Sequence, residues 1–456
     1  MTVLTSDRHR AQKWSAVPRP THNLRRKPRL EPTRNGGANS EELRGPLQLA
    51  AEKIGLGAVP RTVVALGMVS FFMDISSEII HSLLPAFLVT ALGVSALSVG
   101  IIEGIAEATA SISKVFSGAI SDWIGKRKPL VLLGYGLAAV TKPLFPLAGN
   151  AGLVLLARFV DRIGKGIRGA PRDALVADMT PPELRGSAFG LRQSMDTVGA
   201  FVGPLLAMLL MAASRDNFRL VFWVAVLPAA AAVLVVVYGV EEPAVPRDNG
   251  RRRFPIQRAE LAQLNAGFWW LVGVATILTL ARFSEAFLLL AAQHVGMPLA
   301  FIPGVLVTMN IVYAASAYPF GRLSDRMSRR TLLLVGVGIL IAADIVLATA
   351  GTVWQVVIGA AIWGLHMGAT QGLLAALVVG TAPAHLRGTA FGFYSLITGV
   401  ALLVASVVAG WLWTAFGPAE TFIAGALFAG LALLGIILRA SPEGGAGIPP
   451  HDLKRA

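Results

Sequence analysis

Long apolar segments alternate with short polar ones along most of this chain. From residue 62 onward, runs of about 20 or more mostly apolar residues recur, and each is long enough to cross a hydrocarbon core of about 30 Å as a helix. The runs lack the strict alternation of polar and apolar residues that marks the strands of a transmembrane barrel. The pattern therefore predicts an all-α membrane protein with twelve transmembrane helices, at residues 62–90, 96–119, 130–148, 152–178, 187–213, 218–240, 266–292, 300–320, 331–350, 353–381, 388–415 and 419–438.

The composition agrees with this class. Of the 456 residues, 54% are hydrophobic and only 14% are charged. A soluble chain could not keep so much apolar surface from water. The chain contains no cysteine, which excludes disulfides, thiolate catalysis and metal sites with cysteine ligands. No set of nucleophile and base stands out, and no metal-ligand cluster does. We therefore expect no enzymatic activity, no metal and no cofactor.

The basic residues between the runs predict the orientation. They gather in the amino-terminal tail and in the segments 125–129, 251–258 and 325–330, whereas most of the alternate loops carry no lysine or arginine. The loop at 213–219 is the exception. By the positive-inside rule, both termini are expected in the cytoplasm of a bacterial cell, with the protein in the inner membrane. Residues 1–61 contain no apolar core, so the first span itself is expected to direct insertion.

The net charge of +14 raises the question of a nucleic-acid partner. Much of the positive charge lies in residues 1–61, which are rich in Arg, Pro and Gly, have few aromatic residues and are predicted to be disordered. Such a tail fits a topology determinant that contacts anionic lipids. No folded recognition module accompanies it, so we expect membrane lipids and no nucleic acid as partners.

An internal repeat divides the chain. Residues 174–190 align with residues 376–392 at an offset of 202, and Asp122 aligns with Asp325 at an offset of 203. The repeat predicts two pseudo-symmetric six-helix bundles, at 62–240 and 266–438, joined by a cytoplasmic linker at 241–265 and followed by a cytoplasmic tail at 439–456. Doubling of this kind is typical of alternating-access transporters, whose substrate site lies between the two halves.

The loop between the second and third spans has a specific pattern. It combines Gly, Asp and Gly with basic residues, and the second half repeats it with Ser328 in place of the second glycine. With this pattern, residues from about 60 to 440 resemble the major facilitator superfamily. The matching residues are Gly118, Ser121, Asp122, Gly125, Lys126, Arg127 and Lys128 in the first copy, and Gly321, Ser324, Asp325, Arg329 and Arg330 in the second.

The resemblance implies a role for these residues. In the family, this cluster holds the cytoplasmic side closed when the carrier faces outward. Gly118 would let a neighbouring helix approach closely. Asp122, at a helix end, could stabilise the positive amino-terminal end of a facing helix. The cluster is therefore expected to act as a conformational latch. A loop that is merely basic would explain the Lys and Arg but not the Gly and Asp.

The fifth span carries a second resemblance. Gly190, Gly199, Gly203 and Pro204 match a motif associated with the antiporters of the superfamily, although Ala207 and Met208 replace the final glycine pair. The match favours an exporter. The alternative is packing alone, because Gly199 and Gly203 also form a pair of small residues that allows close helix contact.

Ionisable residues concentrate in the first half. Those of the fourth span recur every three or four positions, so several share one helix face, and that face cannot contact lipid at a cost of roughly 2.5–3.5 kcal/mol per central charge. At about 1.5 Å per residue, Asp74, Glu107 and Arg162 fall near mid-membrane, and Glu78, Glu103 and Arg158 lie nearer the outer side. The candidates for a proton-coupling site and substrate cavity are Asp74, Glu78, Glu103, Glu107, Arg158, Asp161, Arg162, Lys165, Arg168, Asp196 and Glu285.

Two interpretations of these charges remain open. A fully paired network could simply hold spans one, two and four together. Alternatively, carboxylates one turn apart repel each other when both are ionised, which favours proton binding by one of them, as a proton-coupled carrier requires. His81 is expected at the outer membrane interface and not as a proton carrier. Gly164, Gly166 and Gly169 form a GxGxxG string, but no strand precedes it, so we expect it to bend the helix and not to bind a dinucleotide.

These observations favour a secondary active transporter, acting as a monomer, that exports a small organic molecule in exchange for protons. The first alternative is an importer or exchanger of an anionic metabolite, with the fourth-span cations binding the anion. The second is a receptor or assembly factor built on a transporter scaffold. The latch copies and buried charges disfavour this second alternative, because a scaffold would not need them.

Overall fold

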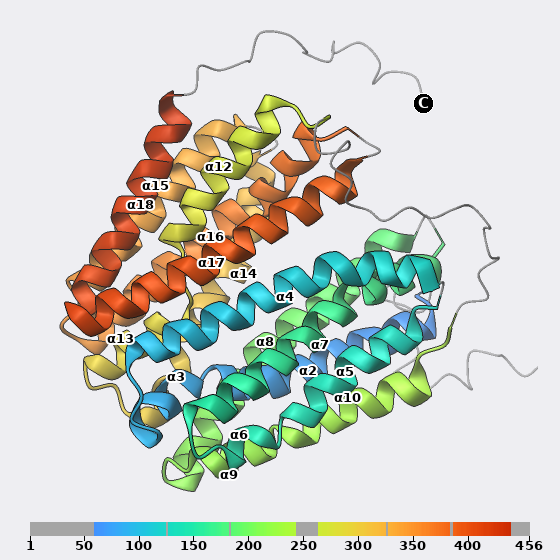
Figure 1. Cartoon of the computed structure of the whole chain (residues 1–456), viewed down its shortest axis with the longest axis horizontal. Helices are drawn as coiled ribbons and strands as arrows, with labels where there is room; N and C mark the ends of the chain where they lie inside the picture. Colours follow the sequence, from blue (N-terminus) through green and yellow to red (C-terminus); the bar gives the residue numbers. More distant parts are fainter. Residues whose placement is uncertain are drawn as a thin grey trace, which may run out of the picture. The chain divides into compact units, whose positions relative to one another are not determined.

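The computed structural model describes residues 59–124, 126–181, 184–242, 263–324, 327–383 and 386–438. The regular structure of these residues is helical (Figure 1). The first half contains α2 (Arg61–His81), α3 (Leu84–Ala86), the π-helical turn η2 (Phe87–Ala91), α4 (Ala96–Ile124), α5 (Lys128–Thr141), α6 (Leu144–Leu147), α7 (Ala151–Asp178), α8 (Arg185–Ser214), α9 (Phe218–Val224) and α10 (Val226–Gly239). The second half contains α12 (Ala266–Ala281), α13 (Ala286–His294), the 3-10 turn η4 (Leu299–Phe301), α14 (Gly304–Ser324), α15 (Arg329–Ala348), α16 (Val353–Thr381), α17 (Arg387–Ala415) and α18 (Pro418–Leu438).

Eleven helical segments in the described ranges are long and apolar enough to cross a membrane. Each coincides with one of the predicted spans. The remaining predicted span is α7, whose 28 residues are long enough to cross but carry too many charges to qualify by composition. The helix packs between α4 and α5. The fold class predicted from the apolar pattern is therefore confirmed. The linker at 241–265 lies largely outside the described residues.

Several spans are interrupted. The first changes direction at residues 82–83, just before Pro85, and the third is interrupted beside Pro143, where a missing backbone donor explains the break. The seventh span is different. Its helix α12 ends at Ala281 and α13 begins at Ala286, and the residues between them, 282–285, contain neither proline nor glycine.

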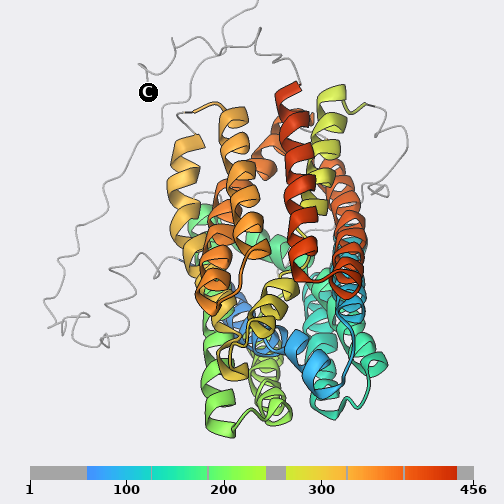
Figure 2. The same cartoon turned by 90° about the vertical axis from the view of Figure 1, so that its left-hand side faces the viewer.

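The two halves meet along specific helix pairs. The helix α4 of the first half runs beside α17 of the second, and α8 packs against α14 and η4 (Figure 1). At one end of the bundles, α13 also contacts α3 and α4. Figure 2 shows the long helices of both halves running roughly parallel. The contacts between the halves are therefore made by long helices and, at one end, by the short segments that follow the breaks in spans one and seven.

Glycines allow α4 and α17 to touch through their backbones. A Cβ atom at Gly100 would lie 2.2 Å from the carbonyl oxygen of Ser406, and one at Gly410 would lie 2.7 Å from the carbonyl oxygen of Ala96. Both distances are shorter than any stable contact, so only glycine fits at these positions in this conformation. The two halves are thus tightly closed against each other near the start of α4.

We expect Gly100→Val to separate α4 from α17. Overpacking of this kind costs about 1–3 kcal/mol, which corresponds to a change of at least about fivefold in the population of the closed contact. The Leu97 amide donates to Thr414 Oγ1 at 3.1 Å across this contact. Cysteines introduced by L97C and T414C should therefore form a disulfide, and the chain contains no cysteine that would interfere.

In membranes treated with a mild oxidant, Gly100→Val should slow the formation of this disulfide at least about fivefold. Gly136→Val is a matched control, because a Cβ atom at Gly136 meets no atom within 4 Å. Equal rates in the wild-type and Gly100→Val backgrounds would show that the contact does not depend on this glycine.

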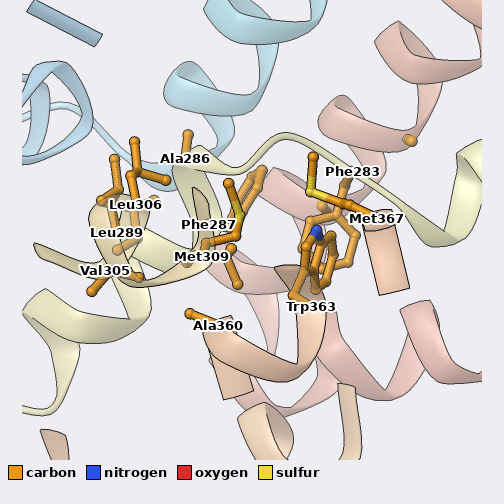
Figure 3. Packing of buried hydrophobic residues seen from close by; sticks show 14 of the residues in the cluster. Phe283, Ala286, Phe287, Leu289, Val305, Leu306, Met309, Ala360, Trp363 and Met367 are labelled. Atoms are coloured by element: carbon orange, nitrogen blue, oxygen red, sulfur yellow. The ribbon is translucent and has the colours of Figure 1, made fainter. Parts of the chain in front are cut away.

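An aromatic cluster packs around the break in the seventh span (Figure 3). The ring centroid of Phe283 lies 5.6 Å from those of Trp363 and Phe422 and 5.5 Å from that of Phe287. Such tilted and edge-on contacts anchor the non-helical segment between α16, α18 and α13. The break is therefore held by packing, and the charged side chains on either side of Phe283 have fixed positions.

Candidate functional site

A cavity of about 610 Å³ lies between the two halves. Its wall combines residues from α2, α4, α7 and α8 with residues from α12, α14, α16, α17 and the break in the seventh span. The size suits a small molecule, for which binding cavities of about 300–1,000 Å³ are usual. The charged residues of the wall are Glu78, His81, Glu103, Glu107, Arg162, Lys165, Arg282 and Glu285.

Two ion pairs connect α4 with α7. The guanidinium of Arg158 donates to Glu103 at 2.5 Å, and Arg162 lies 3.3 Å from Glu107. Glu103 and Arg158 are almost completely buried, whereas Glu107 is about one-third exposed to the cavity. These pairings join the residues that the sequence places at equal depth.

His81 extends this network toward α2. Its Nδ1 atom lies 3.4 Å from Glu78 Oε2, and its Nε2 atom lies 3.6 Å from Glu103 Oε2. The sequence predicts an interfacial residue here. The structure instead places His81 in the cavity wall, as the link between two carboxylates on different helices. The two carboxylates, Glu78 on the same helix and Glu103 on α4, hold the imidazole in the cavity wall.

A third buried pair was not expected from the sequence. Lys142, only 2% exposed at the end of α5, donates to Asp161 of α7 at 3.0 Å and to Ser77 of α2 at 3.0 Å. Asp161 therefore forms an ion pair with a lysine behind the cavity, and it is not part of the cavity wall. In the second half, the repeat offset of 202 residues aligns Asp344 with Lys142 and Trp363 with Asp161.

Asp74 occupies a different position from the other first-half acids. Its carboxyl group lies near that of Asp196 on α8, and Lys165 and Arg168 are nearby cations. The two helices approach closely here, because a Cβ atom at Gly199 would lie 3.1 Å from Asp74 Cβ. Two neighbouring carboxyl groups repel each other when both are ionised, which favours proton binding by one of them. This contact can therefore bind or release a proton.

Cations surround this carboxyl pair. Arg172 lies 3.7 Å from Asp196 and donates to Ser70 at 2.9 Å, and Arg192 lies 3.5 Å from Asp196. The guanidinium of Arg168 stacks 4.6 Å from the ring centroid of Tyr135. The candidates from the sequence are thus divided among three places. Glu78, Glu103, Glu107, Arg162, Lys165 and Glu285 line the cavity, Asp74, Arg168 and Asp196 lie between α2, α7 and α8, and Arg158 and Asp161 are buried outside the cavity lining.

In the second half, the charged groups are fewer. Arg282 and Glu285 both lie in the seventh-span break and in the cavity wall. Asp344 is 0% exposed, and neither of its carboxylate oxygens has a hydrogen-bond partner within the described part of the chain. His366 Nδ1 lies 2.7 Å from the carbonyl oxygen of Gly336. Among the described residues, no group of three or more His, Asp or Glu side chains is arranged to hold a metal ion.

Comparison with known proteins identifies the family. The family model described as Major Facilitator Superfamily matches residues 66–306 and 286–455, which together span most of the chain. The chain belongs to the major facilitator superfamily. An uncharacterized MFS-type transporter of Methanocaldococcus jannaschii is 32% identical over 383 residues, covering 82% of this chain and 94% of that protein. The inner membrane transport protein YajR of Escherichia coli is 26% identical over 395 residues, covering 83% of this chain and 81% of that protein.

Solved structures agree on the fold. The crystal structure of a mutant of the nucleoside transporter NupG superimposes with a TM-score of 0.69 at 12% sequence identity, covering 82% of this chain and 98% of that one. At this identity the likeness shows the shared fold and nothing about the substrate. The protein is therefore a multi-pass membrane protein of a transporter family, and its cavity lies between the two halves of a major facilitator fold.

The family's signature loop is partly described. Arg127 forms an ion pair with Asp178 at the end of α7, and its amide donates to Glu242 after α10 at 2.7 Å. The amide of Lys128 donates to the same carboxylate at 2.7 Å. These contacts join the loop to the ends of two other first-half spans. The side chain of Asp122 and all of Gly125 and Asp325 lie outside the described residues, and Lys126 is exposed.

The described glycines of the two motif copies, Gly118 and Gly321, have ordinary surroundings in this conformation. A Cβ atom at Gly118 would lie 3.4 Å from Ala170 Cβ, and one at Gly321 would meet no atom within 4 Å. The close approach expected at Gly118 is thus not present here. In the second copy, Ser328 caps α15 by accepting from the Thr331 amide at 3.1 Å, which explains a serine in place of glycine. Arg329, the next residue, is exposed at the start of α15.

The antiporter-like motif of the superfamily lies along α8. A Cβ atom at Gly203 would lie 2.6 Å from Glu78 Cβ, so Gly199 and Gly203 bring α8 against the acidic face of α2. Pro204 lies inside the same helix, whereas a Cβ atom at Gly190 would meet no atom within 4 Å. Two of these glycines therefore have a packing role, and that role fixes the position of Asp74 and Glu78.

The GxGxxG string of α7 also serves packing. Helix α7 continues through it from Ala151 to Asp178. A Cβ atom at Gly164 would lie 2.5 Å from the Gly134 carbonyl oxygen of α5, and one at Gly166 would lie 2.8 Å from that of Ala110 on α4. The bend expected from the sequence stays a prediction, and the structure shows two close contacts of α7 with the helices on either side of it. These contacts place Arg162 and Lys165 of α7 beside α4.

Proposed function

We propose that this superfamily member is a secondary active transporter that exports a small organic molecule by alternating access, in exchange for protons. The observation that carries the proposal is the cavity wall. Both halves contribute to it, and carboxylates from α2, α4 and the seventh-span break face the same space. A carrier of this kind needs a site that both halves bound and acids that can exchange protons within it.

The proposed direction rests on the glycine motif of α8. The motif resembles that of the superfamily's antiporters, and it places the acids of α2 against α8, where Asp74 meets Asp196. We propose that proton binding at this helix contact and substrate binding in the cavity alternate. The bundles at 62–240 and 266–438 would then move against each other in a single chain, with lipids around them.

The proposed location is the bacterial inner membrane, which is also the location in the name of the relative YajR. We expect a reporter fused after Pro298, or within residues 351–354, to behave as external. A reporter within the linker at 241–265 should behave as cytoplasmic, because basic residues cluster there. Alkaline phosphatase and fluorescent-protein fusions in living bacteria measure this directly, and the reverse pattern would contradict the proposed orientation.

Import or exchange of an anionic metabolite is the second candidate. The cations of the cavity wall favour an anion, and they do not determine the direction of transport. A receptor or assembly factor on a transporter scaffold is a weaker candidate, since such a protein would not need alternating access to the cavity.

The test is flux into proteoliposomes. Purified full-length protein is reconstituted in liposomes, and a pool of organic acids, neutral metabolites and cationic drugs is offered with and without an imposed pH gradient. Mass spectrometry then identifies what accumulates. We expect at least one compound to accumulate only when the gradient drives exchange for protons. Equal accumulation with and without the pH gradient would contradict proton coupling. If no compound accumulates, the receptor interpretation is favoured.

A further inference from the structure

The charges of the cavity wall do not all pair with one another. Glu107 is paired with Arg162, Glu78 with His81, and Glu103 with both His81 and Arg158. Lys165, Arg282 and Glu285 have no hydrogen bond or ion pair within 4 Å through their side chains among the described residues. The unpaired groups are thus two cations and one acid, and the two cations lie on different halves.

The position of Lys165 leaves its ammonium in the cavity. The residue is exposed although its helix neighbours Gly164 and Gly166 are buried against α5 and α4. A lysine at membrane depth is costly unless water or an anion accompanies it. The residue one turn earlier, Asp161, is already held by Lys142, so it does not neutralise Lys165.

Arg282 is presented by the break in the seventh span. The chain leaves the helix at this residue, and the Ser284 amide is held by Ser406 Oγ of α17 at 3.3 Å. Helix α13 begins four residues later, at Ala286, and its amino-terminal end carries a partial positive charge. The Arg282 side chain therefore lines the cavity near a helix start whose first amide, that of Ala286, already donates to Ser284 Oγ at 3.2 Å.

The rest of the wall adjoining the break combines aromatic side chains with polar ones such as Thr279 and Gln371. Phe283, the residue after Arg282, packs against Trp363 in a tilted contact, and Phe391 and Tyr394 line the cavity from α17. The Asn310 amide also faces this space. A ligand bound here would combine an anionic group with an apolar body, because the aromatic wall favours burial of apolar surface.

We propose that the transported substrate is an organic anion with an apolar or aromatic body, and that its anionic group binds between Lys165 and Arg282. This inference rests on the proposed transport function and specifies its substrate class. One ligand contact from each half would let the substrate draw the two bundles together, as alternating access requires. An inside-negative potential also favours the exit of an anion, by about 2.3 kcal/mol per charge per 100 mV.

Binding to the full-length chain in lipid nanodiscs tests the substrate class. The probes are 1-naphthoate, benzoate and decanoate, each with its neutral amide, and the cation benzyltrimethylammonium. We expect at least one carboxylate to bind at least about tenfold more tightly than its amide, and the cation to bind more weakly than either. If no carboxylate binds more tightly than its amide, the proposed substrate class is wrong.

Two charge-removing variants locate the anion site. Lys165→Met and Arg282→Gln should each weaken binding of the preferred carboxylate at least about tenfold and leave binding of its amide unchanged. Lys165→Arg should retain most of the preference. Arg322→Gln removes the same charge from α14 outside the cavity wall, beside Tyr318, and should change nothing. Equal binding of the carboxylate by the wild type and both variants would overturn the proposed site.

The failure of this inference can be distinguished from the failure of the transport proposal. Access of a cavity cysteine from the two membrane faces does not depend on the charge of any ligand. Alternating access without anion preference would reject the substrate class and keep the transporter. Anion binding with access from a single face would instead reject transport.

Discussion

Lys142→Met should destabilise the folded protein by about 3–5 kcal/mol, because it leaves the buried carboxylate of Asp161 without its partner. Lys142 is 2% exposed and donates to Asp161 and Ser77 at the junction where α2, α5 and α7 meet. Arg162 is the nearest other cation, and its Nε atom lies 4.0 Å from Asp161 Oδ2. That distance is too long for a hydrogen bond, so Arg162 cannot replace the lysine.

A double variant separates the effect of removing the whole ion pair from the effect of leaving one charge without its partner. Lys142→Met combined with Asp161→Leu removes both charges and should recover most of the lost stability, since a buried ion pair can often be replaced by apolar residues. Lys126→Met, at an exposed position, is the control and should change stability by less than about 1 kcal/mol. Unfolding by denaturant in detergent measures the free energies. A stable Lys142→Met protein would show that Asp161 is not charged in the folded state.

Asp74→Asn should abolish proton-driven flux and leave the protein folded. The amide group of asparagine can donate to Asp196 as a protonated carboxyl does, so the contact between α2 and α8 survives while the exchangeable proton is lost. We expect gradient-driven accumulation of the transported compound to fall at least about tenfold, and exchange of that compound for itself to stay near the wild-type rate.

Glu107→Gln provides the contrast to Asp74→Asn. Glu107 neutralises Arg162 at 3.3 Å, so the change should lower folded yield and all transport modes together. Parallel measurement of driven flux, exchange and yield separates the two behaviours. Full gradient-driven flux in folded Asp74→Asn protein would show that the proton binds elsewhere, and would move the proposed coupling site to the cavity carboxylates.

The sequence was sufficient to predict the membrane spans and two of the ion pairs. Apolar runs have the length of a membrane, and residues at equal depth on neighbouring helices can meet, which is why Glu103 and Glu107 were expected near Arg158 and Arg162. The partner of Asp161 was not predictable in this way. Lys142 follows a long apolar run next to a proline, a position typical of a lysine at the membrane surface, and only the packing of α5 on α7 buries it.

The break in the seventh span also left no sequence signal. Residues 282–285 contain neither proline nor glycine, and the break is held by the aromatic cluster around Phe283 and by Ser406 of a helix more than 100 residues away. The close contact at Gly100 likewise depends on a partner in the other half. The length of each helix and the depth of its charges were thus predictable, whereas contacts that depend on how helices pack, such as those of Lys142 and Gly100, were not.

Access to the cavity from both membrane faces is the most direct measurement of alternating access. Thr398 of α17 lines the cavity, and Thr398→Cys would introduce the sole thiol of a chain that has none. In oriented proteoliposomes, a membrane-impermeant maleimide should label this cysteine when added to either face. Adding Gly100→Val should speed labelling from the face at which α4 and α17 close. Labelling from a single face, unchanged by Gly100→Val, would contradict alternating access in this protein.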